Sequence, residues 1–490
     1  MKSQFQFVEL IIYEKCKGVQ KTSQKKIIKA SITYEFYCNA TFFGIYTLYN
    51  RTNLWYTYSE KKCKNNFLRR KNMEIVRDRY LKKLLERKEN GLVKVITGIR
   101  RCGKSYLLFH LYRNKLLSMG VAKDHIIALA LDDIANIEYR EAIKLYNYVK
   151  DNIKDDEMHY VFLDEIQMMN SNFTDLINGL LHIENLDIYV TGSNSKFLSS
   201  DILTEFRGRG DEIRVYPLSF AEFCTAYDNK NEAWKDYYTY GGLPLILSRK
   251  TDELKAEYLI SLFNNIYLKD IKERNSIKTD DELDILVDIV ASATGSLTNP
   301  TKISNSFKSM SQKSLSDKTI KLYLDHLSDA FLIEKSVRFD VKGKKYINTP
   351  AKYYFEDVGL RNARLNFRQQ EENHIMENII YIELRSRGYR VDVGVVEVYE
   401  TSNSGKREKK FLEIDFIANK GDKKYYIQSA FEMTSPEKIV QEKKSLTKLN
   451  DFFKKIIVVK DDIKPNTDEQ GIITVGIFDF LLNDNILEQI

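Results

Sequence analysis

The segment GIRRCGKS, from Gly98 to Ser105, constrains the fold of this 490-residue chain more than any other feature. It follows an apolar run at 92–97 that predicts a buried strand, and apolar residues at helical spacing follow it in 106–112. A strand, a glycine-containing loop and a helix, with the spacing G-x-x-x-x-G-K-S, are typical of a loop that wraps phosphate groups. The alternative is a glycine-containing turn that matches the pattern by chance.

Each fixed position of this segment has a physical role in phosphate binding. Gly98 and Gly103 allow backbone turns that a side chain would block, and the loop amides and the helix N-terminus direct partial positive charge at phosphate oxygens. We expect Lys104 to reach the β and γ phosphates of ATP and Ser105 to place its hydroxyl on Mg²⁺. The predicted ligands are therefore ATP and Mg²⁺.

Two acids follow another apolar strand, predicted at 159–163. Asp164 could support Mg²⁺ through a water molecule, and Glu165 could polarise the water that attacks the γ-phosphate. Taken alone, a strand that ends in two acids is a common entry to a solvated loop. Together with the phosphate loop about 60 residues upstream, the pair favours nucleotide hydrolysis.

Polar and basic residues after the next strand complete the predicted site. The strand predicted at 187–191 ends in a polar cluster in which Asn194, or Ser193, could orient the attacking water. Arg207 and Arg209 come before the last strand, predicted at 212–216. We expect one of them to contact the γ-phosphate bound to a neighbouring subunit, which implies a homo-oligomer. The alternative is that both are ordinary surface residues on a glycine turn.

Strands and amphipathic helices alternate from residue 73 to residue 249. This pattern, with a further strand predicted at 125–131, indicates an α/β domain whose parallel sheet is covered by helices on both faces.

At this point the chain resembles the prokaryotic AAA+-superfamily ATPases that are fused to a C-terminal domain of uncertain function. The matching motifs occur in the order ITGIRRCGKSYLL, YVFLDEIQ, YVTGSNS, RGR, VYPLSFAEF, YGGLP and YLKDI. The resemblance runs from Met73 to the C-terminus. It implies a P-loop fold of the AAA+ type, with Asn194 at the sensor position and Arg209, or Arg207, as the arginine finger. It does not imply a substrate.

The basic charge of the chain is confined to its first residues. The net charge is +7, but residues 1–72 carry 14 Lys and Arg against 4 Asp and Glu, so the rest carries a net charge of −3. This segment shows no sustained period, and a helical pattern begins after Met73. We expect residues 1–72 to be an atypical extension that is disordered or not native; the alternative is a basic arm that binds nucleic acid.

Residues 250–365 predict a helical connector followed by a winged-helix-like domain. A long helix at 251–274 precedes three short helical patterns and a small hairpin, an arrangement whose third helix can enter the DNA major groove. On that helix Lys318, Lys321, Asp325 and His326 are expected to face outward, which is a surface of mixed sign. The domain could therefore contact DNA or only pack against its neighbours.

Residues 366–490 resemble the core of restriction endonucleases: a helix with a glutamate, three strands, a helix and a strand. Glu377 matches the helix acid and Asp415 matches the strand acid. On the next strand Gln428 stands in place of the second carboxylate and Ala430 in place of the lysine, and a neutral amide is a poorer ligand for Mg²⁺. We therefore expect a nuclease-like fold that does not act as a nuclease.

Composition limits the classes of protein to which this chain can belong. No apolar run approaches the ~18–20 residues of a membrane span and no secretory signal begins the chain, so we expect a cytoplasmic protein without a membrane partner. The five cysteines lack C-x-x-C spacing and predict no metal site. The sequence thus predicts an ATPase that converts ATP and water to ADP and phosphate. The alternatives are a nucleotide-gated DNA-binding or regulatory protein with little turnover, and a metal-dependent nuclease.

Overall fold

The computed structural model describes residues 74–170, 173–193, 208–277, 280–368, 371–401, 407–433 and 435–490. The chain divides into a unit of residues 1–73 and a unit of residues 74–490, and the described residues all belong to the second. The predictions made for residues 1–72, for Asn194 and for Arg207 lie outside the described residues.

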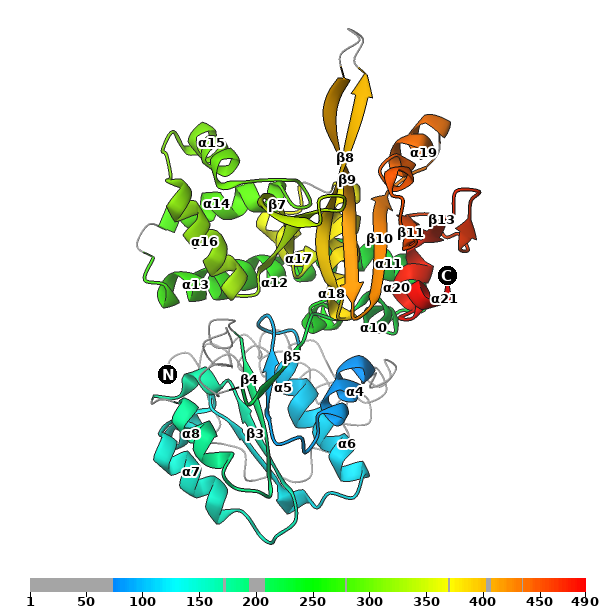
Figure 1. The fold of residues 1–490 in the computed structure, drawn as a ribbon. Coiled ribbons are helices and arrows are strands. Elements are labelled where there is room, and N and C mark those ends of the chain that lie inside the picture. Colours follow the sequence, from blue (N-terminus) through cyan, green and yellow to red (C-terminus); the bar gives the residue numbers. More distant parts are fainter. Residues whose placement is uncertain are drawn as a thin grey trace, which may run out of the picture. The chain divides into compact units, whose positions relative to one another are not determined.

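A five-stranded parallel sheet forms the first part of the described chain (Figure 1). Its strands lie in the order β2-β3-β4-β1-β5. They are short and largely apolar, as expected of strands that are covered on both faces. The strands are β1 Val93–Thr97, β2 Ile126–Ala130, β3 His159–Asp164, β4 Leu186–Gly192 and β5 Gly210–Arg214. The predicted α/β fold with a parallel sheet is confirmed.

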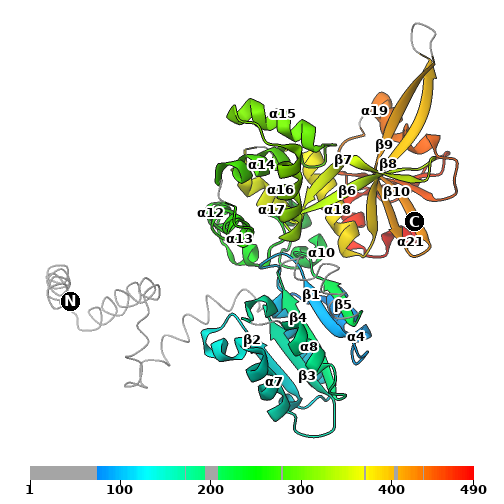
Figure 2. The ribbon, with the colours of Figure 1, turned by 60° about the vertical axis from the view of Figure 1, so that its left-hand side comes forward.

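Helices cover both faces of this sheet (Figures 1 and 2). Because side chains alternate along a strand, Val95 enters the hydrophobic cluster that includes residues of α7 and α8, whereas Ile96 enters the cluster of α4 and of the helical run 104–118. The helices are α4 Asp78–Glu86, α5 Lys104–Tyr106, a π-helical segment Leu107–Tyr112, α6 Arg113–Ser118, α7 Ala142–Asp151 and α8 Phe173–Leu180, with 3-10 turns at Lys123–His125, Ile134–Arg140 and Ile166–Met168.

A helical region follows the sheet. The long helix predicted at 251–274 is confirmed, since α12 Asp252–Leu262, a π-helical segment Phe263–Leu268 and α13 Lys269–Arg274 follow one another without a break. The three short predicted helices are α14 Asp280–Ser292, α15 Pro300–Ser311 and α16 Asp317–Asp329, which lie together beside β7 (Figures 1 and 2). The other helices here are α10 Phe220–Cys224, α11 Lys230–Tyr240, a 3-10 turn Pro244–Ser248 and α17 Val358–Arg364.

The outer surface expected for α16 needs one correction. Lys318, Lys321 and Asp325 are exposed as predicted, but His326 is buried. Its ring lies 6.5 Å from that of Tyr323, between the core positions Leu324 and Leu327, so it packs with the inner face of the helix. An imidazole has an apolar body, and the spacing of polar residues alone does not place it.

An eight-stranded sheet follows, in the order β12-β13-β11-β10-β9-β8-β6-β7. The predicted hairpin forms β6 Ile333–Asp340 and β7 Lys345–Phe355, and β6 also pairs in parallel with β8. The hairpin therefore extends the C-terminal sheet across the predicted boundary at residues 365 and 366. The other strands are β8 Arg390–Thr401, β9 Arg407–Lys420, β10 Lys423–Ala430, β11 Lys454–Val459, β12 Asn466–Thr467 and β13 Ile472–Gly476.

Helices pack on the two faces of the larger sheet. α18 Glu372–Ser386 and α20 Ile477–Leu482 share a hydrophobic cluster with Phe416 and Ile427, whereas the 3-10 turn Leu446–Lys448 shares a cluster with Ile414 and Tyr426. The helix predicted at 436–450 is shorter than expected, since α19 ends at Lys443. The remaining helix is α21 Ile486–Gln489. Among the described residues no helix has both the length and the apolar character needed to cross a bilayer.

Candidate nucleotide-binding site

The predicted phosphate loop connects the carboxyl end of β1 to the start of α5. Gly98 has φ 142° and Gly103 has φ 101°, both in the region that favours glycine. A Cβ on Gly98 would lie 2.0 Å from the carbonyl oxygen of Val215, so no side chain fits there. Gly103 is the N-cap of α5, which begins at Lys104. The two glycines thus allow the turn into the helix that the sequence predicts.

Lys104 is buried within this loop. Its ammonium donates to the carbonyl oxygens of Gly98 (2.9 Å) and Ile99 (3.1 Å), and the residue is only 4% exposed. Both partners are neutral groups, and the ammonium lies next to the start of a helix. A phosphate group at the loop would offer it stronger, charge-assisted hydrogen bonds.

Ser105 and Asp164 lie close together, although they come from different elements. Asp164 ends β3, is buried, and accepts a hydrogen bond from the hydroxyl of Thr191. Burial raises the pKa of Asp164, while the nearby hydroxyls of Thr191 and Ser105 oppose that rise. A hydroxyl and a carboxylate are hard oxygen donors, so this pair fits Mg²⁺.

Glu165 follows in an unusual backbone conformation, with φ 50°. Its amide donates to the Thr191 hydroxyl (2.9 Å), and its carboxylate accepts hydrogen bonds from Gln167 and Ser193. Thr191 and Gln167 were not predicted from the sequence. The signal for Thr191 was its place at the end of β4, which neighbours β3 in the sheet.

Arg209 lies at the other edge of the sheet. It is exposed and precedes β5, whose first residue pairs with Val93 at the start of β1. The phosphate loop leaves the far end of β1, after Thr97, so about four strand residues, or ~13 Å, separate the two ends. Arg209 thus lies at the opposite end of the sheet from the phosphate loop of its own chain.

Arg77, which was not predicted, binds the backbone of the phosphate loop. It is buried and donates to the carbonyl oxygens of Cys102 (3.1 Å) and Tyr216 (2.7 Å). Its guanidinium also pairs with Glu222 at 3.0 Å. The loop is thus fixed to the segment that follows β5. No local pattern indicated this, because the partners lie far apart in the sequence.

The connector helix contacts the loop on its other side, through residues of the YLKDI motif. The Tyr267 hydroxyl donates to the carbonyl oxygen of Arg100 (2.6 Å), and Asp270 pairs with Arg100 (3.3 Å) and Arg274 (2.9 Å). Burial raises the pKa of Asp270, and the nearby Glu165 carboxylate raises it further. The connector thus lies close to both the loop and the proposed catalytic acid.

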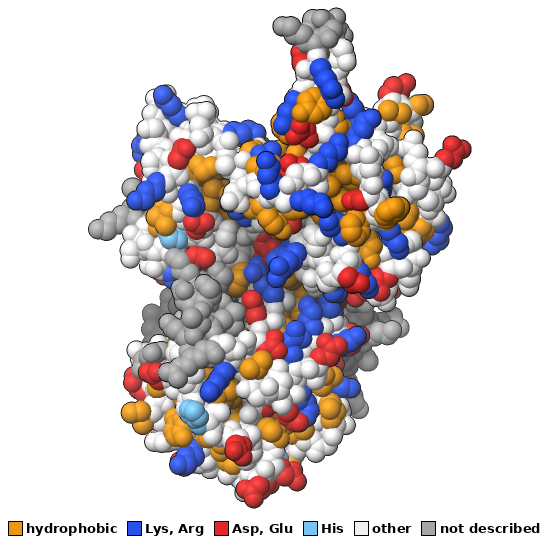
Figure 3. Space-filling view, viewed as in Figure 1, with side chains coloured by type: hydrophobic (Ala, Val, Ile, Leu, Met, Phe, Trp, Pro, Cys, Tyr) orange, Lys and Arg blue, Asp and Glu red, His pale blue; other side chains and the backbone are white. Residues whose placement is uncertain are grey.

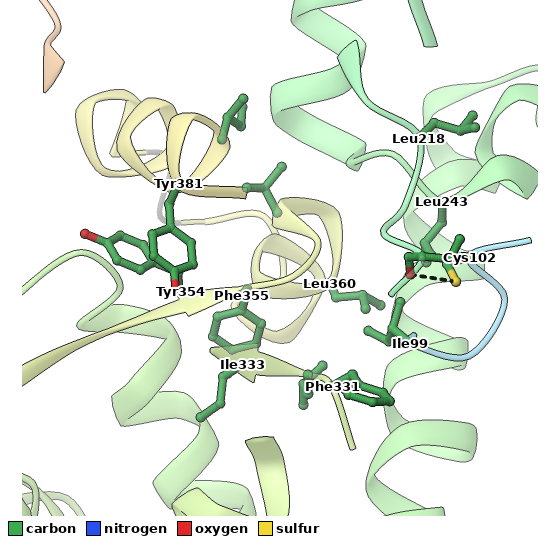
Figure 4. Packing of buried hydrophobic residues seen from close by; sticks show 14 of the residues in the cluster. Ile99, Cys102, Leu218, Leu243, Phe331, Ile333, Tyr354, Phe355, Leu360 and Tyr381 are labelled. Atoms are coloured by element: carbon green, nitrogen blue, oxygen red, sulfur yellow. Dashed lines mark hydrogen bonds between the residues drawn. The ribbon is translucent and has the colours of Figure 1, made fainter. Parts of the chain in front are cut away.

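The YGGLP motif has a packing role. Gly241 has φ 74°, and a Cβ there would lie 2.1 Å from the Asp357 carboxylate. The Gly242 amide donates to that carboxylate (2.8 Å), which also caps α17 through Leu360. Figure 4 shows Ile99 and Cys102 of the phosphate loop beside Leu218 and Leu243; the same cluster continues to Leu360, Phe331 and Phe355. The core is therefore continuous from the loop to the C-terminal sheet.

A second group of carboxylates lies in that sheet and contains the two predicted nuclease-like residues. Glu377 on α18 and Asp415 on β9 are buried, and both contact the ammonium of Lys352 on β7, at 2.8 Å and 3.1 Å. Glu413 contacts the same ammonium at 2.7 Å. Ala430 stands at the position of the motif lysine, as the sequence shows, but Lys352 brings an ammonium to these acids from a strand outside the pattern.

Gln428, the predicted replacement for the second acid, lies next to this group: its side-chain oxygen is 3.4 Å from the Asp415 amide. The Ser429 amide donates to the Asp415 carboxylate (2.9 Å). Burial raises the pKa of Glu377 to about 7, against the attraction of Lys352. The Lys352 ammonium donates hydrogen bonds to Glu377 and Asp415 and forms a further ion pair with Glu413.

Comparison with known proteins identifies the first part of the chain. Residues 90–224 match the family described as AAA domain, and residues 231–371 match a domain of unknown function, DUF8612. An uncharacterized protein of Haemophilus influenzae is 35% identical over 415 residues, which are 83% of this chain and 98% of that protein. An uncharacterized protein of Methanocaldococcus jannaschii is 30% identical over 363 residues, which are 71% of this chain and 76% of that protein.

Among solved structures, the Aeropyrum pernix ORC1 protein in complex with DNA is similar, with 12% identity over 60% of this chain and 93% of that chain, at a TM-score of 0.26. A similarity with a TM-score of this size does not assign a function. The assignment of the chain rests instead on the match to the AAA domain and on the 35% identity with the Haemophilus influenzae protein, 98% of which is covered. This chain has an AAA domain and belongs to the same family as the uncharacterized Haemophilus influenzae protein.

Proposed function

We propose that this protein binds ATP with Mg²⁺ at the phosphate loop, hydrolyses ATP to ADP and phosphate, and couples this turnover to conformational change or assembly. One observation carries the proposal: Ser105, the residue after Lys104 at the start of α5, lies close to the buried Asp164 at the end of β3, and its hydroxyl opposes the rise in the pKa of that carboxyl. Residues from two separate elements thus provide, at one point, a hydroxyl, a carboxylate and a lysine, which Mg²⁺ and phosphate groups together require.

Each side chain has a distinct role in this proposal. Gly98 and Gly103 shape the loop, Lys104 binds the β and γ phosphates, and Ser105 and Asp164 hold the metal. When bound, Mg²⁺ would neutralise phosphate charge and polarise the phosphoryl oxygens.

The proton chemistry belongs to Glu165, which prepares the attacking water. Thr191 fixes this residue, because its hydroxyl donates to Asp164 and accepts from the Glu165 amide. Asn194 orients the water, and Arg209, or Arg207, completes the site of a neighbouring subunit. This role requires a homo-oligomer.

Coupling is supported by the contacts between the two sheets. Arg214, the last residue of β5, and Tyr216, which follows that strand, both donate to Glu334 on β6, at 3.0 Å and 2.8 Å. Arg385 on α18 binds the same carboxylate at 2.7 Å. We propose three functional parts: an ATPase domain at 73–249, a connector with a winged-helix-like domain at 250–365, and a restriction-endonuclease-like domain at 366–490.

ATP binding and turnover of two variants test the proposal. Lys104→Ala should lose nucleotide binding, since it removes the phosphate-binding charge. Glu165→Gln should keep binding and lose turnover by about 10²–10⁴-fold. Lys82→Ala is the matched control, because this lysine is 79% exposed on α4. Undiminished ATP affinity in Lys104→Ala would overturn the assignment, and unchanged turnover in Glu165→Gln would remove its role as base.

A second candidate function is nucleotide-gated DNA binding with little turnover. It is favoured by the three helices α14–α16 followed by the hairpin β6–β7, the elements of a winged helix. Against it, the exposed side chains of α16 are of mixed sign. Duplex DNA binding by the full chain, compared with Lys318→Glu/Lys321→Glu, decides between a DNA contact and a packing module; equal binding by both removes the DNA role of this helix.

Metal-dependent cleavage of DNA is the least supported candidate. The acids that would hold the metal instead surround the Lys352 ammonium, and Gln428 offers a neutral amide where a carboxylate is needed. We propose that this part of the chain serves as a scaffold. Plasmid cleavage with Mg²⁺ or Mn²⁺ that is lost in Asp415→Asn would contradict this.

A further inference from the structure

A hollow of about 450 Å³ lies in the C-terminal sheet, and neither Asp164 and Glu165 nor Glu377, Glu413 and Asp415 line it. Its lining includes Phe339 and Tyr346 of the hairpin β6–β7, Arg390 at the start of β8, Lys420 at the end of β9 and Lys424 of β10. A second hollow of about 250 Å³ shares Gly388 and Arg390 with the first and extends to Lys83 on α4. The two hollows thus form one concave surface.

Basic side chains outnumber acidic ones in the lining of this surface. Among the described residues, none of Lys83, Arg390, Lys420 and Lys424 forms an ion pair with a carboxylate. Burial and repulsion by neighbouring cations, Lys420 among them, lower the pKa of Lys83 to about 8. Like charges held together in this way are stabilised by a bound anion.

Two carboxylates line the hollows, and each already has a hydrogen-bond donor. Asp392 accepts from the Tyr346 hydroxyl (3.4 Å), and Glu212 accepts from the Thr97 hydroxyl (2.8 Å). In Figure 3, Lys and Arg side chains gather near the middle of the face that Figure 1 presents, at the level of the lower ends of β8 and β9.

Aromatic rings alternate with these cations. Tyr346 is 63% exposed, and its ring lies 5.1 Å from that of Phe339. The Lys424 ammonium lies 4.7 Å from the Phe453 ring, and the Lys420 ammonium lies 5.4 Å from the Tyr389 ring. A large aromatic ring left open to solvent beside cations that form no ion pair offers a flat face on which a base can stack.

We propose that this surface binds a single-stranded nucleic acid, with phosphates on Arg390, Lys420, Lys424 and Lys83 and a base on Tyr346. A strand fits better than other polyanions. A lipid surface is flat and would not enter a hollow, and an acidic peptide has no need of an open ring. A duplex hides its bases from stacking. The site is separate from α16 and from the phosphate loop, and binding requires no ATP.

Fluorescence anisotropy of the full chain with a labelled strand of about 16 thymidines, a length within the range of known sites, tests the proposal. The variant is Arg390→Gln/Lys424→Gln. The control is Lys82→Gln/Lys464→Gln, which removes the same charge at side chains that are 79% and 89% exposed. Residues 1–72 are present in both proteins and contribute equally, so the difference reports on the hollow.

The double variant should bind at least about tenfold more weakly than the control, and the slope of log K against log salt should fall by about 1.4, or ~0.7 for each lost phosphate contact. Tyr346→Ala should weaken binding by about fivefold to 100-fold, whereas Tyr346→Phe, which keeps the ring, should bind like the unaltered protein.

Equal binding by the double variant and its control would overturn the proposal. Unchanged binding by Tyr346→Ala would also overturn it, since any polyanion would then serve. Binding to phosphatidylserine vesicles is measured as well. If the protein binds these vesicles through Arg390 and does not bind the strand, the surface is a membrane-binding site instead. Stronger binding of a duplex of equal length would rule out the stacked strand.

Discussion

Lys104 and Lys352 are both buried lysines, yet their ammonium groups have opposite surroundings. Lys104 donates to two neutral backbone carbonyls, whereas the Lys352 ammonium forms ion pairs with three carboxylates. The first ammonium can exchange its partners for phosphate oxygens at little cost. Removing the Lys352 ammonium would instead leave three neighbouring carboxylates without their counter-charge. Lys104 is thus free to bind a phosphate group, whereas Lys352 stabilises the fold.

Replacing Lys352 is the strongest test of this contrast. Lys352→Met should lower the free energy of unfolding by about 3–5 kcal/mol, because it leaves buried carboxylates without their counter-charge. Denaturant unfolding measures the change. Lys335→Met, on the neighbouring strand and exposed, is the control and should lie within about 0.5 kcal/mol of the unaltered protein. Unchanged stability of Lys352→Met would show that the Lys352 ammonium does not stabilise the fold.

The pH dependence of stability sharpens the contrast at Glu377. Its pKa of about 7 lies above the ordinary value of 4.5, so between these values the folded protein holds a proton that the unfolded chain does not. Stability from this group is therefore complete below about pH 4.5 and is lost as pH rises through 7. Relative to Glu377→Gln, the unaltered protein should lose up to about 3 kcal/mol across this window.

Denaturant unfolding of the two proteins at several pH values measures this difference. Parallel stability curves for Glu377→Gln and the unaltered protein would show that the Glu377 carboxyl titrates alike when folded and unfolded.

In the nucleotide site, the matching test concerns activity. Thr191→Val removes the hydroxyl that joins Asp164 to the Glu165 amide and should lower ATP turnover by about tenfold or more, since a misplaced base and an unpaired amide together cost about 1–3 kcal/mol. Thr191→Ser keeps the hydroxyl and should retain turnover. If turnover in Thr191→Val equals that in Thr191→Ser, the hydroxyl has no positioning role.

The smallest expected effect is at Tyr354. Its hydroxyl donates to Glu377 at 2.6 Å, and Tyr354→Phe should lower stability by about 1 kcal/mol, the net worth of one buried hydrogen bond. ATP turnover, measured in the same preparation, should not change. A large fall in turnover would show that the second group of acids takes part in the ATPase reaction, and the contrast between the two lysines would fail.

The sequence predicted most elements because their signals are local. All five strands of the first sheet were found from apolar runs, and the connector helix and α14–α16 from helical spacing. The phosphate loop was found from fixed spacing, and the structure places Gly98, Gly103, Lys104 and Ser105 at the strand–helix junction as predicted. The roles of Glu165 and Arg209 stay predictions, as does that of Asn194.

The features that the sequence did not predict depend on contacts between segments that are distant along the chain. His326 was placed on the wrong face of α16 because periodicity does not say how an imidazole packs. Arg77 could not be linked to the loop, since it binds carbonyl oxygens 25 and 139 residues away. The YGGLP motif was obscure until Asp357 was found against Gly242.

The sequence by itself determined the phosphate loop, the strand that delivers Asp164, and the α/β character of the first domain, because each is written in residues that are close along the chain. Only the tertiary structure decided what the two buried lysines do. A lysine carries the same charge wherever it stands, and its availability depends on which acids the fold brings to it. For Lys104 the fold brings carbonyl groups; for Lys352 it brings three carboxylates from α18 and β9.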